Sequence, residues 1–365
     1  MSDRAAQLHA NPWRGVFYIT GGGTELISEM LTTPGASRTV LEVTVPYAHA
    51  ALTALLGRTP GQSCSAPTAR AMAMAAFQRA HALGAAEGDD AHVFGFACTA
   101  SLASDREKRG RHRAYIAVQT DWDTHFAEIA LAGDRAEEEQ QLVEALWGVL
   151  MATLHTSEIL EHPFESVRAD ARWRDILLGN APAVVTEEHD GGLLLSGSFN
   201  PLHHGHERML DVAEQVTGRH GAYELSMVNP DKPPLDYHEV GARLAQFNEP
   251  VWLTRLPTFI EKAAHFPGTV FAVGIDTITR VDAVRYYADV RGRDAAIAEL
   301  ARYSCEFLVF GRVDDDQFVQ LDDLELSPIL RGICKSVPPY LFREDVSSTA
   351  LRAQREEAVL HSSPG

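Results

Sequence analysis

Two histidines at short spacing, His203 and His206, stand in the stretch Gly-Ser-Phe-Asn-Pro-Leu-His-His-Gly-His of residues 197–206. The stretch directly follows an apolar run that predicts a strand over residues 193–196, and it opens a segment with helical periodicity. The backbone N–H groups of such a turn and of a helix N-terminus favour a phosphate chain. Gly205 has no side chain, so phosphate can approach the helix closely. The two imidazoles lie on one side of the first turn and can stabilise charge that develops during displacement.

A second phosphate-binding pattern, Val-Ser-Ser-Thr-Ala-Leu-Arg, occupies residues 346–352. Ser and Thr before a helical run are N-cap residues, and their hydroxyl and N–H groups can also hold a phosphate. Arg352 would add a planar cation that matches phosphate oxygens. The two patterns together predict a nucleotidyltransferase in the C-terminal half. It would move a nucleoside monophosphate from a triphosphate onto a phosphate acceptor.

Alternating strand and helix patterns must position these residues. In the second half, apolar runs predict strands at residues 193–196, 223–228, 251–255, 269–273 and 306–310, with a helix at 207–216 among the intervening segments. This alternation implies parallel βαβ units and a Rossmann-like, doubly wound parallel sheet, whose ligands bind at the carboxyl ends of the strands. In the first half, strands are predicted at 15–20 and 114–119 and helices at 24–33, 68–83 and 137–154.

The chain has 365 residues, too many for one ordinary core, and two α/β domains are expected. We place an N-terminal domain at residues 1–168, a linker region rich in Gly, Pro and polar residues at 169–190, and the nucleotidyltransferase domain at 191–365.

The composition excludes several classes of protein. Hydrophobic residues make up 45% and charged residues 22%, which indicates a folded rather than a disordered chain. A formal net charge of -18 argues against nucleic acid or an anionic membrane as a partner. The four cysteines form no CxxC pair, so neither a zinc site nor a disulfide framework is expected, and no metal-ligating residues are proposed. Without a signal peptide or an apolar span, a cytoplasmic protein is expected.

The two motifs resemble the HxGH and ISSTxxR signatures of the nucleotidylyltransferase superfamily, which includes nicotinamide-mononucleotide adenylyltransferases and phosphopantetheine adenylyltransferase. Val346 stands where the signature has Ile. Matching the motifs position by position, the resemblance implies that nucleotide is bound by Gly197, Ser198, Phe199, Asn200 and Gly205, and by Ser347, Ser348 and Thr349.

The resemblance continues between the motifs. Lys232 follows a predicted strand where pyridine-mononucleotide adenylyltransferases carry a loop with a basic residue. Gly274 and Asp276 resemble the G-x-D element that contacts adenosine, and residues 256–259 fall where that family has a substrate-side loop. Taken alone, Lys232 could be a solvated loop lysine and Asp276 a helix N-cap.

The implied reaction is in-line attack of an acceptor phosphate on the α-phosphate of ATP, with release of pyrophosphate. Mg²⁺ bound with ATP would neutralise the triphosphate. The acceptor phosphate is ionised at neutral pH, so catalysis needs positioning and charge stabilisation rather than a general base. The residues expected to carry it are His203, His206, Lys232 and Arg352.

The first half resembles the C-terminal domain of CinA, the nicotinamide-mononucleotide amidase family. The resemblance rests on residues 20–23, 34–37, 46–47 and 55–57. Where that family has its nucleophilic Ser, its neighbouring Cys, its Ser-Asn pair and its Lys, this chain has Tyr18, Ile19, Ala48-His49 and Leu52. Thr20 and Ser37 are the hydroxyls left nearby, without an evident activating partner. We therefore expect a non-catalytic domain. The Gly21-Gly22-Gly23 turn could hold an anion or be a tight turn only.

Three functions remain open at this point. The leading one is an adenylyltransferase whose acceptor is nicotinamide or nicotinate mononucleotide, because both halves resemble families that handle a pyridine mononucleotide. A cytidylyltransferase acting on a phosphorylated small molecule would use the same two motifs. A nucleotide-binding regulator with little turnover would use the same fold, with a first domain that senses a nucleotide or only builds a homo-oligomer.

Overall fold

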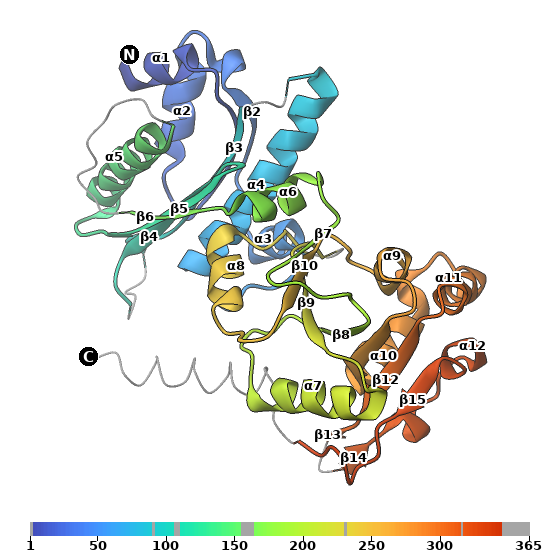
Figure 1. Ribbon diagram of the computed structural model, residues 1–365. Coiled ribbons are helices and arrows are strands. Elements are labelled where there is room, and N and C mark those ends of the chain that lie inside the picture. Colours follow the sequence, from blue (N-terminus) through green and yellow to red (C-terminus); the bar gives the residue numbers. More distant parts are fainter. Residues whose placement is uncertain are drawn as a thin grey trace. The chain divides into compact units, whose positions relative to one another are not determined.

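The computed structural model describes residues 3–89, 92–105, 110–154, 164–229, 232–314 and 317–344. The chain forms two compact units (Figure 1). Unit 1 comprises Met1–Leu178 together with Val228–Val240, and unit 2 comprises Gly179–Met227 together with Gly241–Gly365. We call Val228–Val240 the inserted segment, because it follows the third strand of unit 2 in the chain but packs with unit 1.

Unit 1 contains a six-stranded mixed sheet in the order β2-β1-β3-β4-β5-β6. Strand β1 pairs in parallel with β2 and β3, whereas β3, β4, β5 and β6 form an antiparallel series. The strands span Arg14–Thr20 (β1), Val40–Thr44 (β2), Val93–Ser101 (β3), Arg113–Gln119 (β4), Asp123–Ala130 (β5) and Glu165–Arg168 (β6).

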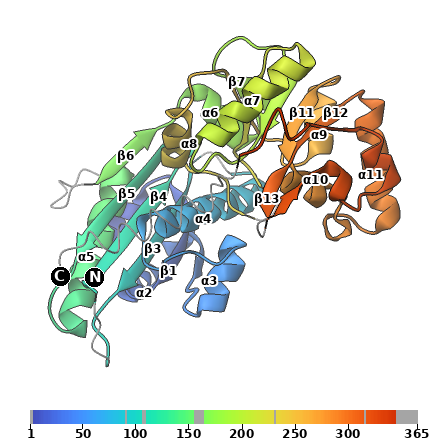
Figure 2. The same cartoon turned by 90° about the horizontal axis from the view of Figure 1, so that it is seen from below.

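Helices cover both faces of this sheet, as Figure 1 and the view from below in Figure 2 show. Helices α1 (Asp3–Ala10), α2 (Thr24–Thr32) and α5 (Arg135–Thr153) enclose the main apolar core on one face. Helices α4 (Ala66–Glu87) and α3 (His49–Leu56) pack on the other face. A capping box of Asp134 and Glu137 starts α5, and Ser65 caps α4 by accepting the Thr68 N–H.

The inserted segment is anchored in unit 1 by a buried cation. The Arg70 guanidinium lies 3.2 Å from an Asp236 carboxylate oxygen and 3.0 Å from one of Glu239, and the Arg70 and Asp236 side chains are 4% and 5% exposed. Burial raises the pKa of Asp236 more than the Arg70 charge lowers it. The guanidinium also lies 4.9 Å from the centre of the Phe126 ring.

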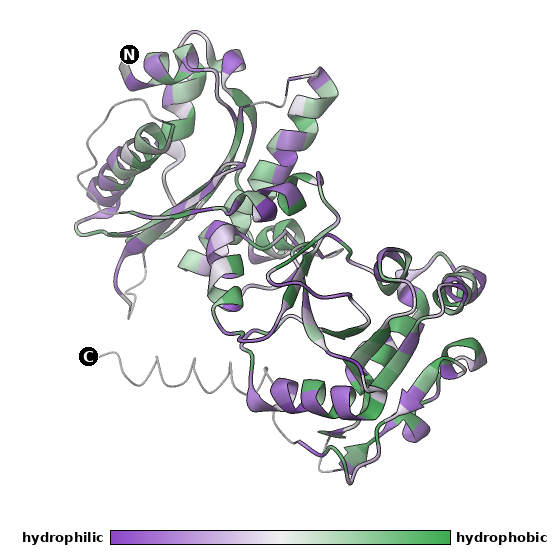
Figure 3. Cartoon of the chain, in the orientation of Figure 1, coloured by the Kyte–Doolittle hydropathy of each residue, from purple (hydrophilic) through white to green (hydrophobic). Residues whose placement is uncertain are grey.

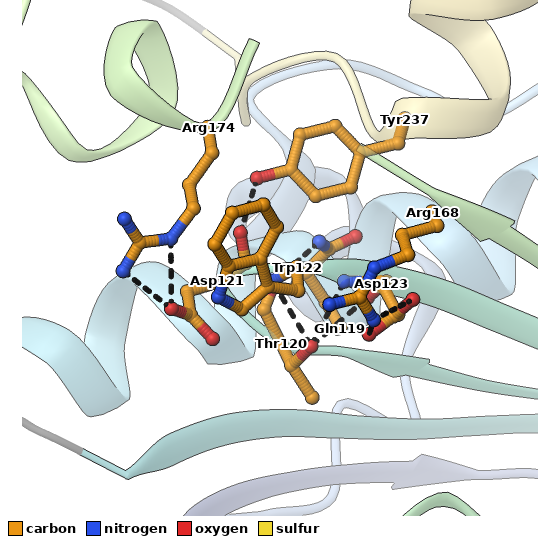
Figure 4. A network of polar contacts seen from close by, with 8 residues as sticks. All are labelled: Gln119, Thr120, Asp121, Trp122, Asp123, Arg168, Arg174 and Tyr237. Carbon is orange, nitrogen blue, oxygen red and sulfur yellow. Dashed lines mark hydrogen bonds and ion pairs between the residues drawn. The ribbon is translucent and has the colours of Figure 1, made fainter. Parts of the chain in front are cut away.

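A second anchor surrounds the turn between β4 and β5 (Figure 4). The Tyr237 hydroxyl donates a hydrogen bond of 2.7 Å to the Asp121 carbonyl, and Arg174 of α6 (Ala171–Leu178) pairs with the Asp121 carboxylate at 2.8 Å. The guanidinium groups of Arg174 and Arg168 lie 4.6 and 5.0 Å from the Trp122 ring centre. This turn therefore holds two segments of unit 1. One is α6, after which the chain first enters unit 2, and the other contains Tyr237, shortly before the chain enters unit 2 again.

Unit 2 contains a seven-stranded sheet in the order β15-β12-β11-β8-β9-β10-β7. All neighbours pair in parallel except the edge strand β7, which is antiparallel to β10. The strands span Ala183–Val185 (β7), Leu193–Ser196 (β8), Ala222–Ser226 (β9), Val251–Thr254 (β10), Val270–Gly274 (β11), Glu306–Phe310 (β12) and Cys334–Ser336 (β15). Strands β13 (Arg312–Asp314) and β14 (Gln317–Val319) form a separate two-stranded sheet.

The helices of unit 2 connect consecutive parallel strands. Helix α7 (His204–Thr217) lies between β8 and β9 in the chain, and α8 (Tyr237–Leu244) precedes β10. Helices α9 (Phe259–His265), α10 (Ile275–Asp282), α11 (Val290–Arg302) and α12 (Pro328–Arg331) share one apolar cluster with β11 and β12. Helix α7 carries both hydrophilic and hydrophobic residues, whereas β11 and β12 are mainly apolar (Figure 3).

Most elements predicted from the sequence coincide with observed ones. The strand predicted at residues 193–196 is β8, and the helices predicted at 24–33 and 137–154 are α2 and α5 with small shifts of their ends. The region 169–190, expected to be a linker, contains α6 and β7, and the chain passes into unit 2 after Leu178. The antiparallel half of the first sheet was not anticipated, because the apolar runs of strands paired in either direction look alike. Across the described part of the chain, no helix combines the length and apolar character needed to span a bilayer.

Arg70→Met should release the inserted segment, because it leaves Asp236 buried without its cation. Removing one partner of a buried ion pair costs about 3–5 kcal/mol. Amide hydrogen exchange at Tyr237 and Val240 should therefore accelerate strongly. The matched control is Arg79→Met, which removes an exposed guanidinium that pairs with Glu42 and should leave these amides unchanged. Unchanged exchange in Arg70→Met would contradict the anchoring role of Arg70.

Candidate functional site

The turn that joins β8 to α7 is held by hydrogen bonds from the last turn of α8 and from the residues just after it. Arg243 donates to the Ser198 carbonyl at 2.8 Å. The Gln246 amide donates to the Phe199 carbonyl at 3.2 Å and accepts the Leu202 N–H at 2.9 Å. The backbone of residues 197–202 is thus held by side chains of unit 2 itself.

Phe199 adopts a backbone conformation that side chains rarely tolerate, with φ of 44°. Its ring is 1% exposed and lies edge-on to His206, Tyr223 and Phe247, with ring centres 5.1–5.2 Å apart. Strained residues persist where the surroundings over-determine them, and they cluster at functional sites. This aromatic cluster therefore maintains the strained turn and forms one wall beside His206.

The imidazole rings of His203 and His206 are stacked. Their centres lie 3.7 Å apart and their planes are inclined by 23°. The Nδ1 atoms of both rings are buried without a hydrogen-bond partner among the described residues, and so is Oγ of Ser196 at the end of β8. Buried polar atoms are normally paired, so unpaired ones at the carboxyl end of a strand indicate a place where a ligand supplies the partner.

Both imidazoles are held in their neutral form. Burial lowers the pKa of His206 to about 3, with a further contribution from the neighbouring His203 ring. Burial also lowers the pKa of His203, against the opposing charges of Glu207 and Glu344. Each neutral ring carries one N–H donor and one acceptor. The pair can therefore donate hydrogen bonds to phosphate oxygens. Because both rings are neutral, no charged imidazolium has to be buried in the protein.

Gly205 makes the stack possible in a way the sequence did not reveal. A Cβ at this position would lie 3.0 Å from Nδ1 and 3.1 Å from Cε1 of His203. The absent side chain thus leaves room for the His203 ring, in addition to the close phosphate approach expected from the sequence.

In the second expected element, Gly274 ends the neighbouring strand β11 and Asp276 lies in the first turn of α10. Strands β8 and β11 pair in parallel with Leu195 opposite Ala272, so the residues after both strands meet at one edge. A Cβ on Gly274 would meet no atom within 4 Å. The Asp276 carboxylate forms an ion pair with Arg312 at the start of β13. Arg312 was not identified from the sequence, because nothing in its local pattern signals this partner.

Two groups of expected site residues lie outside what unit 2 can test. Lys232 belongs to unit 1, where it forms an isolated bridge with Asn229, and its role at the acceptor stays a prediction. The second motif, residues 346–352 with Ser347, Ser348, Thr349 and Arg352, lies outside the described residues.

A buried polar triad next to the turn was not predicted from the sequence. The Glu224 carboxylate of β9 is fully buried and accepts hydrogen bonds of 2.6 Å from both Lys262 and Thr254. A lone Glu inside an apolar strand is the signal that could have predicted a buried partner. The Gly197 N–H donates to the Glu224 carbonyl, so the triad supports the backbone from which the turn starts.

In unit 1 the positions compared with the amidase family offer no activated nucleophile. Tyr18 is 5% exposed, and burial together with Glu42 raises its pKa, which keeps the phenol protonated. The Thr20 hydroxyl donates to the Pro46 carbonyl at 3.2 Å, and the Tyr47 side chain is exposed.

The Gly21–Gly23 turn is filled by an internal anion. Gly21 and Gly23 have φ of 86° and 84°, and the Glu139 carboxylate accepts the Gly23 N–H at 2.8 Å. Arg135 donates to the Gly21 carbonyl at 3.2 Å. The turn thus does bind a carboxylate, but the carboxylate belongs to α5 of the same unit. Within the described ranges there is no cluster of three or more His, Cys, Asp or Glu residues that could hold a metal ion.

No protein-family model matches the chain, and no curated protein matches it. Solved structures of competence- or damage-inducible proteins are similar to part of it. The protein from Enterobacter asburiae is 16% identical, with 41% of this chain and 92% of that chain covered and a TM-score of 0.34. Protein CihA from Agrobacterium tumefaciens is 18% identical, covering 42% and 94%, with a TM-score of 0.35. A CinA superfamily protein from Escherichia coli is 15% identical, covering 42% and 93%, with a TM-score of 0.32.

Gly205→Ala should disturb the imidazole stack, because the added methyl group displaces the His203 ring by a few tenths of an ångström. We expect water to reach His206 and its pKa to rise from about 3, as measured by titration of the histidine ring protons in NMR spectra. Gly292→Ala in α11 is the matched control, since its nearest atom would lie 3.5 Å away. An unchanged His206 titration in Gly205→Ala would show that the stack does not depend on this glycine.

The neutral state of His206 also predicts a pH dependence of stability. Its pKa is about 3 in the folded chain, below the ordinary value of 6.5, so the unfolded chain binds more protons between these values. The free energy of unfolding of unit 2 should thus fall as the pH drops below 6.5, by at most about 1.4 kcal/mol per pH unit from this group. In His206→Asn this part of the slope between pH 6.5 and 5 should vanish in denaturant titrations. Equal slopes in both proteins would contradict the burial of a neutral His206.

Proposed function

We propose that unit 2 is a nucleotidyltransferase that transfers AMP from Mg·ATP to a phosphorylated acceptor and releases pyrophosphate. The observation that carries the proposal is the stacked pair His203 and His206 at the start of α7, whose buried Nδ1 atoms have no hydrogen-bond partner in the described part of the chain. A triphosphate placed against this helix N-terminus would provide the missing acceptors and would meet backbone N–H groups of the same turn.

The position of the pair in the sheet supports this function. Numbered by their appearance in unit 2 from β8 onward, the parallel strands have the order 3-2-1-4-5-6. This is the order of the Rossmann-like doubly wound fold, in which ligands bind where the strand order reverses. The reversal lies between β8 and β11, the two strands that lead into the histidine turn and into Gly274.

The proposed chemistry follows from the state of the side chains. An acceptor phosphate is already ionised at neutral pH, so it attacks the α-phosphate without a general base. The departing pyrophosphate takes the electron pair of the broken bond, and charge accumulates on the phosphate oxygens. Neutral imidazole N–H groups of His203 and His206 would donate to those oxygens in a site with little water, where such bonds are strongest. Arg352 would add a fixed cation.

The adenosine side is assigned to the neighbouring strand end. The Asp276 carboxylate lies in the first turn of α10 and is oriented by Arg312, which makes it a suitable acceptor for ribose hydroxyl groups. A side chain built at Gly274 would meet no atom within 4 Å, which leaves space for a sugar or a base beside it. We propose a pyridine mononucleotide as the acceptor, on the basis of the resemblance of both halves to families that handle one.

His206→Asn should lower turnover far more than it weakens ATP binding, because the hydrogen bond of His206 gains strength in the transition state. The loss in kcat should be about 10²–10³-fold, with Kd for ATP changed by less than about 10-fold. The assay measures pyrophosphate released from Mg·ATP or Mg·CTP with nicotinamide mononucleotide, nicotinate mononucleotide and other phosphorylated acceptors.

His204→Asn is the control for that experiment. His204 stands in the same turn, but its side chain is 75% exposed and lies 3.8 Å from Glu207. Its replacement should leave kcat near the wild-type value. Nucleotide binding without pyrophosphate release for any acceptor would instead indicate a regulatory protein. Faster release from Mg·CTP than from Mg·ATP would indicate a cytidylyltransferase.

A further inference from the structure

The side-chain amide of Gln246 uses all of its hydrogen-bonding groups between the end of α8 and the turn that joins β8 to α7. Its Nε2 group donates to the Phe199 and Arg243 carbonyls, both at 3.2 Å, and its Oε1 atom accepts the Leu202 N–H at 2.9 Å. Arg243 lies in the last turn of α8, where carbonyl groups lack partners within the helix. The amide therefore satisfies one carbonyl of α8 and two backbone groups of the turn.

These three partners require the chemistry of an amide. The Leu202 N–H needs an acceptor, whereas the carbonyls of Phe199 and Arg243 need donors. A carboxylate of nearly the same shape offers acceptors only, so it would face two carbonyl oxygens without a proton between them. A protonated carboxyl group has one donor and one acceptor. It could therefore replace both bonds to the turn, although not the bond to Arg243.

The residue that Gln246 holds is the one whose ring borders His206. Phe199 has the left-handed φ of 44°, and its ring centre lies 5.1 Å from that of His206. The ring of Phe247, the residue after Gln246, packs edge-on against the same Phe199 ring at 5.2 Å. Two consecutive residues thus hold Phe199 by its carbonyl and by its ring. A displacement of Phe199 would move the surface against which the His206 imidazole is oriented.

We propose that Gln246 is a positioning residue of the nucleotidyl-transfer reaction, and that through Phe199 it sets the orientation of the His206 ring toward the triphosphate. The proposal rests on the proposed function, because it takes the triphosphate as the ligand of His206. A misplacement of about 1 Å can lower the rate of an enzyme about 10²-fold. The effect of losing Gln246 should therefore appear mainly in kcat.

Gln246→Glu in the full-length protein tests the proposal through the pH dependence of kcat. At about pH 8, pyrophosphate release from Mg·ATP and nicotinamide mononucleotide should have a kcat about 10²-fold below wild type, with Kd for ATP changed by less than about 10-fold. The two facing carbonyl oxygens raise the pKa of the introduced carboxyl group above its ordinary value. As the pH falls to about 5, this group takes up a proton and regains the bonds to Phe199 and Leu202, so the ratio of wild-type to variant kcat should fall toward one.

The NMR signal of the His206 Cε1 proton, assigned through His206→Asn, gives a second readout that needs no turnover. In Gln246→Glu it should be displaced from the wild-type position at about pH 8 and return toward it at about pH 5. Gln246→Met removes all three bonds without adding charge, so its kcat and its His206 signal should differ from wild type at both pH values. Gln215→Glu makes the same charge change at an exposed position of α7 and should match wild type throughout.

Wild-type kcat and a wild-type His206 signal in both Gln246→Glu and Gln246→Met would overturn the proposal. Losses in Gln246→Glu that are equal at the two pH values would do the same. Because Gln246→Met is neutral, it decides the question by itself if the charged variant does not fold. If the wild-type protein releases no pyrophosphate, the transferase function fails, and the His206 signal alone then shows whether Gln246 orients that ring.

Discussion

Desolvation of two stacked imidazole rings is the constraint around which the site in unit 2 is organised. His206 can remain neutral far below its ordinary pKa only if water is excluded from its ring, and the Phe199 ring excludes it on one side. Phe199 can take this place only with a left-handed backbone, which Arg243 and Gln246 stabilise through the neighbouring carbonyl groups. The conformation of the motif therefore depends on Arg243 at the end of α8 and on Gln246 just after it.

The two glycine-rich turns of the chain show how a common local structure acquires different roles. Both follow a buried strand and open a helix whose N–H groups attract an anion. In unit 1 the Glu139 carboxylate supplies that anion at the Gly23 N–H. In the described part of the unit 2 turn, no internal carboxylate accepts hydrogen bonds from the helix N-terminus. The Nδ1 atoms of His203 and His206 lie there without hydrogen-bond partners. Side chains distant in sequence make this difference. The sequence around Gly21–Gly23 alone was therefore compatible with an anion site and with a tight turn only.

The sequence predicted the elements well, because long apolar runs and helical periodicity report burial directly. It located β8, α7 and the histidine pair, since these are contiguous in the chain. It could not predict that residues 228–240 pack with unit 1, because that depends on Arg70, Asp121 and Thr124, which lie more than a hundred positions away. It also missed Arg312 beside Asp276.

Nucleotidyl transfer requires attack at the α-phosphorus of the triphosphate and not at the γ-phosphorus. The most direct measurement follows the label from ATP carrying ³²P at the α-position, incubated with Mg²⁺, the full-length protein and nicotinamide mononucleotide. Attack at the α-phosphate predicts that the label moves into a dinucleotide as unlabelled pyrophosphate is released. Label that remains in ATP, or that appears only in ADP after attack at the γ-phosphate, would contradict nucleotidyl transfer by the histidine site.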